Sequence, residues 1–157
     1  MCAAHAEQRT VRLGAALVRF DGARWATSET TGAVYFNPQG EAARKLDAVE
    51  LRRIPDDGVV TCETHATRAF GLGQYDLGSI VRTPMSVGNI AGERFTAHTR
   101  CRNATPRGEV ACARVANAVY LMVAVNDGCQ GNNLFSGIEP LGEIAAGMAF
   151  DAASSAP

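Results

Sequence analysis

Residues 94–115 read RFTAHTRCRNATPRGEVACARV, and they contain two segments of alternating apolar and polar residues around a polar, proline-containing stretch. In the first segment Phe95 and Ala97 share a face with Cys101, and in the second segment Cys112 lies on the apolar face. Strict alternation is typical of a half-buried β-strand. The stretch therefore predicts an antiparallel hairpin, and this hairpin decides the fold class.

The neighbouring sequence extends this hairpin into a sheet. Residues 118–125, AVYLMVAV, are apolar at every position, which is typical of a central strand covered on both faces. Residues 9–37 contain short β-prone runs separated by turn residues, and residues 59–70, VVTCETHATRAF, alternate like another half-buried strand. We therefore predict a mainly antiparallel sheet of about five to seven strands.

Two segments have helical spacing. Residues 40–54 place Ala42, Leu46 and Val49 on one stripe, and the charges at its ends suit a helix dipole. Near 139–150, Leu141 and Ile144 repeat at helical spacing. Together with the strands, these two helices predict an α+β fold.

The length of 157 residues fits one domain. We expect a flexible N-terminus over 1–8, a single α+β domain over 9–150 and a disordered tail over 151–157. The net charge of −1 gives no general attraction to nucleic acid or to anionic membranes. The longest apolar run, Ala118–Val125, is much shorter than the roughly 18 residues of a membrane span, so we predict no transmembrane segment.

The chain has five cysteines, and four of them lie inside the predicted domain. If the hairpin turn is centred near Thr105–Pro106, Cys101 and Cys112 face each other and can form a disulfide. Cys62 and Cys129 would then form a second one. Buried free thiols are the alternative, because unpaired cysteine is a common core residue. A zinc site is disfavoured, because the chain lacks closely spaced Cys and His pairs.

The N-terminus, MCAAHAEQ, is suggestive of export in two ways. Ala4-His5-Ala6 has the small-x-small form of a signal-peptidase site, and Cys2 is a candidate lipidation site. Disulfides persist in oxidising compartments. These observations lead us to expect a protein of the bacterial envelope, either periplasmic or lipid-anchored.

A basic segment gives the most specific hint of binding. Residues 65–114 contain seven arginines against three carboxylates. Arg94, His98, Arg100 and Arg102 would share one exposed strand face that could bind an anionic group or an acidic protein. A solvated sheet face guarded against edge pairing is the alternative. Nucleic acid is a poor fit, since aromatic residues do not alternate with these arginines.

The sequence contains only weak signals of a catalytic site. Cys129 could act as a nucleophile with a histidine, as in a small hydrolase, and His65 and His98 could bind a metal together with Glu63. The glycine-rich GLGQYDLG segment starting at Gly71 lacks the dinucleotide-binding spacing, and the single Lys45 lies outside any phosphate loop. We expect no cofactor and no catalytic residue. The leading hypothesis is an exported binding domain, with a small hydrolase, a metal enzyme or a cytosolic interaction module as rivals.

Overall fold

The computed structural model of the chain describes residues 7–44, 48–72, 75–99, 107–124 and 140–151. Over these ranges, strands and short helices form an α+β fold, which confirms the predicted fold class. The elements are β1 (Gln8–Leu13), β2 (Ala16–Asp21), β3 (Trp25–Thr30), β4 (Ala33–Pro38), η1 (Gly40–Arg44), β5 (Val49–Pro55), α1 (Cys62–Gly71), η2 (Leu77–Ser79), β6 (Val81–Val87), β7 (Ile90–His98), β8 (Arg107–Val115), β9 (Ala118–Ala124), α2 (Pro140–Ala146) and β10 (Met148–Phe150).

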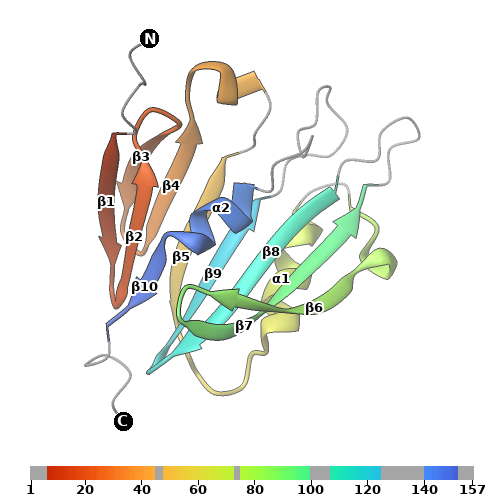
Figure 1. Ribbon diagram of the computed structural model, residues 1–157. Helices are drawn as coiled ribbons and strands as arrows, with labels where there is room; N and C mark the ends of the chain where they lie inside the picture. The colour runs from red at the N-terminus through yellow and green to blue at the C-terminus, as the bar shows by residue number, and fades with distance from the viewer. Residues whose placement is uncertain (1–6, 45–47, 73–74, 100–106, 125–139, 152–157) are drawn as a thin grey trace.

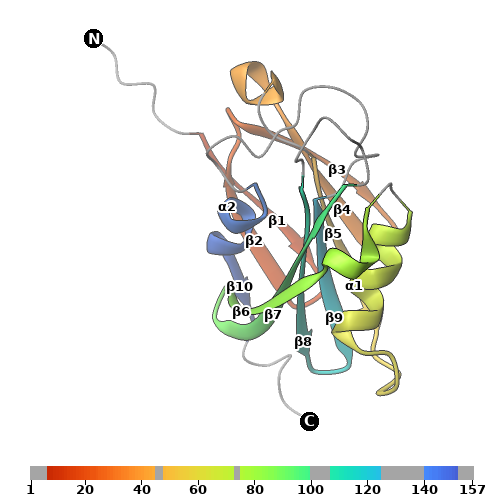
Figure 2. The ribbon, with the colours of Figure 1, turned by 90° about the vertical axis from the view of Figure 1, so that its right-hand side faces the viewer.

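The strands form two antiparallel sheets. The larger sheet has seven strands in the order β3-β4-β5-β9-β8-β7-β6, and the smaller has three in the order β1-β2-β10 (Figure 1). The smaller sheet and α2 lie on one side of the larger sheet, and α1 lies on the other (Figure 2). The described residues are therefore stacked in three layers, with a hydrophobic core on each side of the seven-stranded sheet.

Strand β9 lies in the middle of the larger sheet, as its uninterrupted apolar sequence predicts. It pairs with β5 on one edge and with β8 on the other. Tyr120 and Met122 pack into the core beneath the smaller sheet, whereas Val119 and Leu121 pack into the core beneath α1. Because successive residues of a strand point to opposite faces, a strand buried on both faces must be apolar throughout.

The helix predicted over 40–54 is wrong. Among the described residues of this segment, Gly40–Arg44 form a 3-10 helix and Val49–Pro55 form β5, which pairs with both β4 and β9. Val49 and Leu51 are fully buried and point to the same core. Their two-residue spacing suits a strand, and pairing with two neighbours outweighs the helical spacing of Ala42 and Val49.

The strand predicted over 59–70 is also wrong, because Cys62–Gly71 forms helix α1. Thr61 caps this helix, and its hydroxyl oxygen accepts a hydrogen bond from the Thr64 amide. The buried side chains are Cys62, Ala66, Ala69 and Phe70. They are spaced by four, three and one residues, which is the stripe of an amphipathic helix.

The predicted C-terminal helix near 139–150 is shorter than expected. Helix α2 covers Pro140–Ala146 and buries Leu141 and Ile144, and Met148–Phe150 then forms β10. The two elements are separated by Gly147, whose amide donates to the Ile144 carbonyl. A side chain at position 147 would collide with the Arg19 carbonyl, because an added Cβ would lie 2.0 Å from that oxygen. Glycine therefore allows α2 to turn closely against β2.

Candidate functional site

A disulfide joins the two sides of the core beneath α1. Cys62, the first residue of α1, is bonded to Cys112 of β8, with a Cα–Cα distance of 5.8 Å and a sequence separation of 50. Cys112 is fully buried and Cys62 is almost so. The bond fixes the beginning of the helix to the middle of the sheet.

The predicted pairings of Cys101 with Cys112 and of Cys62 with Cys129 are therefore both wrong. In the β7–β8 hairpin Cys112 lies opposite Glu93, because the register pairs His98 with Arg107. Alternation assigns each residue to a face of the sheet, but a register shift by an even number of residues leaves every face unchanged. A turn centred near 105–106 implies a register that is shifted in this way from the observed one, so the predicted faces of the described residues were right and the predicted cysteine partners were not. Cys2, Cys101 and Cys129 lie outside the described residues.

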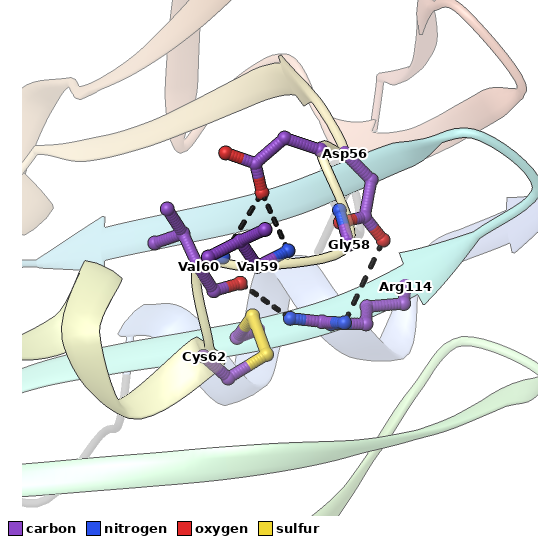
Figure 3. A network of polar contacts seen from close by, with 8 residues as sticks. Asp56, Gly58, Val59, Val60, Cys62 and Arg114 are labelled. Atoms are coloured by element: carbon purple, nitrogen blue, oxygen red, sulfur yellow. Dashed lines mark hydrogen bonds and ion pairs between the residues drawn. A yellow bond between two sulfur atoms is a disulfide. The ribbon is translucent and has the colours of Figure 1, made fainter.

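A network of hydrogen bonds and an ion pair stabilises the loop over residues 56–60, beside the disulfide (Figure 3). The Asp57 carboxylate accepts hydrogen bonds from the Val59 and Val60 amides. Arg114 of β8 donates to the Val60 carbonyl, and its guanidinium lies 3.7 Å from the Asp56 carboxylate. These contacts secure the loop that leads from β5 into the first turn of α1. A depression of about 480 Å³ opens over the disulfide nearby.

The predicted arginine face has a different arrangement. Arg94 is ion-paired with Glu109 of β8, whose side chain is fully buried within the fold. His98 is exposed at the end of β7, and Arg100 and Arg102 lie outside the described residues. Since Arg94 already has a buried carboxylate as a partner, anion binding by this face stays a prediction for the other three residues.

His65 and His98, the two candidate metal ligands, lie on different elements. His65 lies on α1, not on a strand as predicted, and His98 lies at the end of β7. Within the ranges that the structure describes, no group of three or more His, Cys, Asp or Glu side chains is placed to hold a metal ion. Cys129, the candidate nucleophile, lies outside those ranges.

A larger cavity than the depression over the disulfide lies on the opposite side of the large sheet, where β2 meets α2 and β10. It is a groove of about 680 Å³. Seven of the twelve described residues that line it are apolar, among them Leu17, Phe20, Trp25, Ile144 and Met148. Figure 1 shows β2, β10 and α2 side by side. We refer to this cavity as the β2–α2 groove.

The groove exists because β10 is short. Its three residues pair with Ala16–Val18 of β2, and the chain enters this strand from α2 through Gly147. The last contact is between the Arg19 amide and the Gly147 carbonyl, at 2.8 Å. Beyond this contact β2 continues to Asp21 without β10 beside it. The outer residues Leu17 and Arg19 of β2 line the groove, and so does Phe20, which is also part of the core.

Trp25 and Glu143 both line the groove and contact each other. Trp25 is the only tryptophan of the chain, and it is buried. Glu143 accepts two hydrogen bonds from Arg24, at 2.6 and 2.9 Å, and its Oε1 lies 3.3 Å from the indole nitrogen of Trp25. These hydrogen bonds, together with the charges of Glu143 and Asp21, raise the pKa of Arg24 against the opposing effect of burial.

The sequence analysis missed this groove, because no local pattern marks it. Its residues come from two segments at opposite ends of the chain, Gln8–Trp25 and Glu143–Ala149, which only the tertiary fold brings together. The single tryptophan is the one local sign, since a large aromatic residue often lines a ligand pocket.

Comparison with known proteins adds no family. No protein-family model matches the sequence, and the search of curated proteins gives no significant match. Neither helix of the described part of the chain has the length and apolarity needed to span a membrane.

Proposed function

We propose that this protein is a non-catalytic binding domain of the bacterial envelope and that it holds a small, largely apolar ligand in the β2–α2 groove. The observation that carries the proposal is the groove itself. Its volume of about 680 Å³ lies within the range of small-molecule sites. Such sites are lined mainly by hydrophobic and aromatic side chains, with a few polar groups that fix the orientation of the ligand.

The polar groups of the groove are consistent with this role. The Glu143 carboxylate is neutralised by two hydrogen bonds from Arg24, so an apolar ligand beside it would not leave an isolated charge buried. The depression over the disulfide is a weaker candidate. Its charged residues Arg82 and Arg114 have ion-pair partners at 3.4 and 3.7 Å, and aromatic residues are absent from its described lining.

The envelope location is supported by the Cys62–Cys112 disulfide. A disulfide buried in the core needs an oxidising environment during folding, and such environments lie outside the cytosol. The domain would be free in the periplasm or attached through a lipid on Cys2. With protein isolated from its native host, a thiol reagent should leave Cys62 and Cys112 unlabelled under denaturing conditions until a reductant is added. Labelling of both without a reductant would contradict the envelope location.

Binding in the groove can be tested with the uncharged dye Nile red, whose emission increases in apolar surroundings. Ala149 is exposed on β10 and lines the groove, so Ala149→Phe should fill part of it without disturbing the core. We expect the folded protein to bind Nile red and the variant to bind it about fivefold more weakly or worse, roughly the loss of one well-packed contact.

Ala26→Phe is the matched control, since Ala26 is exposed on β3 and does not line the groove. This variant should bind the dye like the wild type. Equal binding by all three proteins would show that the dye sits elsewhere, and the proposed site would then be wrong.

A further inference from the structure

Four charged side chains lie in or beside the β2–α2 groove, and three of them already have partners. Glu143 and Arg24 are held together by two hydrogen bonds. Asp21 accepts a hydrogen bond from the Ala23 amide at 2.9 Å, and its charge acts on the guanidinium of Arg24. The two positive and two negative charges cancel, so net charge does not select a ligand here. The choice of ligand therefore depends on which of these four charged side chains still has hydrogen-bonding groups without a partner.

Arg19 is that side chain. It is exposed on the outer face of β2, opposite Gly147 where β10 begins, and it lines the groove. Among the described residues its guanidinium makes neither a hydrogen bond nor an ion pair, in contrast to Arg24 beside it. A guanidinium carries five N–H donors in a planar fork that matches the two oxygens of a carboxylate.

We infer that the groove binds a small amphipathic carboxylate, whose apolar body lies against Leu17, Ala146 and Ala149, the accessible apolar residues of its lining, and whose carboxylate binds Arg19. This inference rests on the proposed function, because it names the class of ligand for the same groove. The Glu143 carboxylate offers a cationic head group no equivalent place, since Arg24 engages both of its oxygens, and Asp21 already accepts a hydrogen bond from the Ala23 amide. A phosphate dianion is a poorer fit than a carboxylate, because a second free cation is absent from the described lining.

The inference can be tested with three ligands that share one apolar chain: octanoate, octan-1-ol and octyltrimethylammonium. Trp25 is the only tryptophan and forms part of the groove, so its fluorescence reports on occupancy directly. We expect octanoate to bind about fivefold more tightly than octan-1-ol and the ammonium compound to bind most weakly. The advantage of octanoate should fall as salt is added.

Arg19→Gln removes the charge at an exposed position and should leave the fold intact. It should weaken octanoate binding to about the level of octan-1-ol, while the affinity for octan-1-ol stays within about twofold of the wild type. Arg68→Gln is the matched control, because Arg68 is exposed on α1, on the other side of the large sheet. This variant should keep the full preference for octanoate.

The outcomes separate the two proposals. If Nile red and octan-1-ol bind in the groove but octanoate has no advantage, or if Arg19→Gln leaves that advantage intact, the carboxylate inference is wrong and the binding groove stands. If neither the dye nor any of the three octyl compounds binds, both proposals are wrong.

Discussion

The buried carboxylate of Glu109 determines the role of Arg94. The Glu109 side chain is 1% exposed and that of Arg94 is 22% exposed, so their ion pair is largely shielded from water. A charge in such surroundings is costly unless an opposite charge compensates it. Arg94 therefore stabilises the fold, and this explains why an arginine occupies a partly buried strand position.

Replacing Arg94 with methionine should reveal this structural role. The change keeps much of the apolar stem but leaves Glu109 without its cation, and we expect a loss of roughly 2–3 kcal/mol in the free energy of unfolding. Chemical denaturation measures this quantity directly. Arg82→Met is the control, because Arg82 pairs with Glu93 at 3.4 Å and is well exposed, so its loss should be below about 1 kcal/mol. Equal losses for the two variants would contradict the structural role.

His65 is a second residue whose surroundings affect its chemistry. It is partly buried on α1, and burial is the main cause that lowers its pKa. Repulsion by Arg68 and Arg114 lowers the pKa further, whereas Asp57 and Asp56 act in the opposite direction. The folded protein therefore holds His65 in its neutral form to lower pH than the unfolded chain does.

This shift makes stability depend on pH in a definite direction. Above the unfolded pKa of about 6.5 the histidine is neutral in both states and contributes nothing. As the pH falls below that value, the unfolded chain takes up the proton more readily, so the folded state loses stability. The lowered pKa of Asp57 stabilises the folded state above the ordinary value of 3.8, and this contribution is lost only as the pH falls below that value, so it does not change between pH 8 and pH 5.5.

His65→Gln should therefore reduce the loss of stability on acidification. We expect the free energy of unfolding to fall less between about pH 8 and pH 5.5 in this variant than in the wild type. Denaturant titrations at both values measure the difference. An identical fall in the two proteins would show that His65 is equally easy to protonate in both states.

At the scale of the elements, the disulfide holds α1 against the sheet. It links residues 50 positions apart in the sequence. The chain-entropy model predicts that closing such a loop stabilises the folded state by about 4 kcal/mol. The double variant Cys62→Ala/Cys112→Ala should lose stability of that order in denaturant unfolding. A loss below about 1 kcal/mol would show that the packing of Ala66 and Phe70 holds the helix without the bond.

The same elements show what the sequence can and cannot predict. Alternation correctly assigned Phe95, Ala97 and Cys112 to one face, because burial on one side of a strand imposes a period of two. The register that decides which cysteines meet depends on long-range pairing and could not be predicted in this way. At Cys62–Gly71 the polar residues between the buried ones resembled strand alternation, although the capping Thr61 indicates a helix.

At the scale of the molecule, the fold class was predictable and the candidate site was not. The central apolar strand β9 and the alternating strands around it were sufficient for a mainly antiparallel α+β fold. The β2–α2 groove depends on how the smaller sheet and α2 pack against the larger one. Trp25 and Glu143 meet there although more than a hundred residues separate them, and neither segment alone indicates the contact.

The account as a whole depends on ligand binding in the β2–α2 groove, and an NMR titration with octan-1-ol tests it most directly. Because the chain has one tryptophan, the Trp25 indole N–H gives a single signal. We predict that this signal and the Gly147 and Ala149 amides shift together and saturate, while the amides of α1 stay in place. Shifts confined to α1 and the exposed side chains of Val59 and Leu72, or no saturable shift at all, would contradict the account.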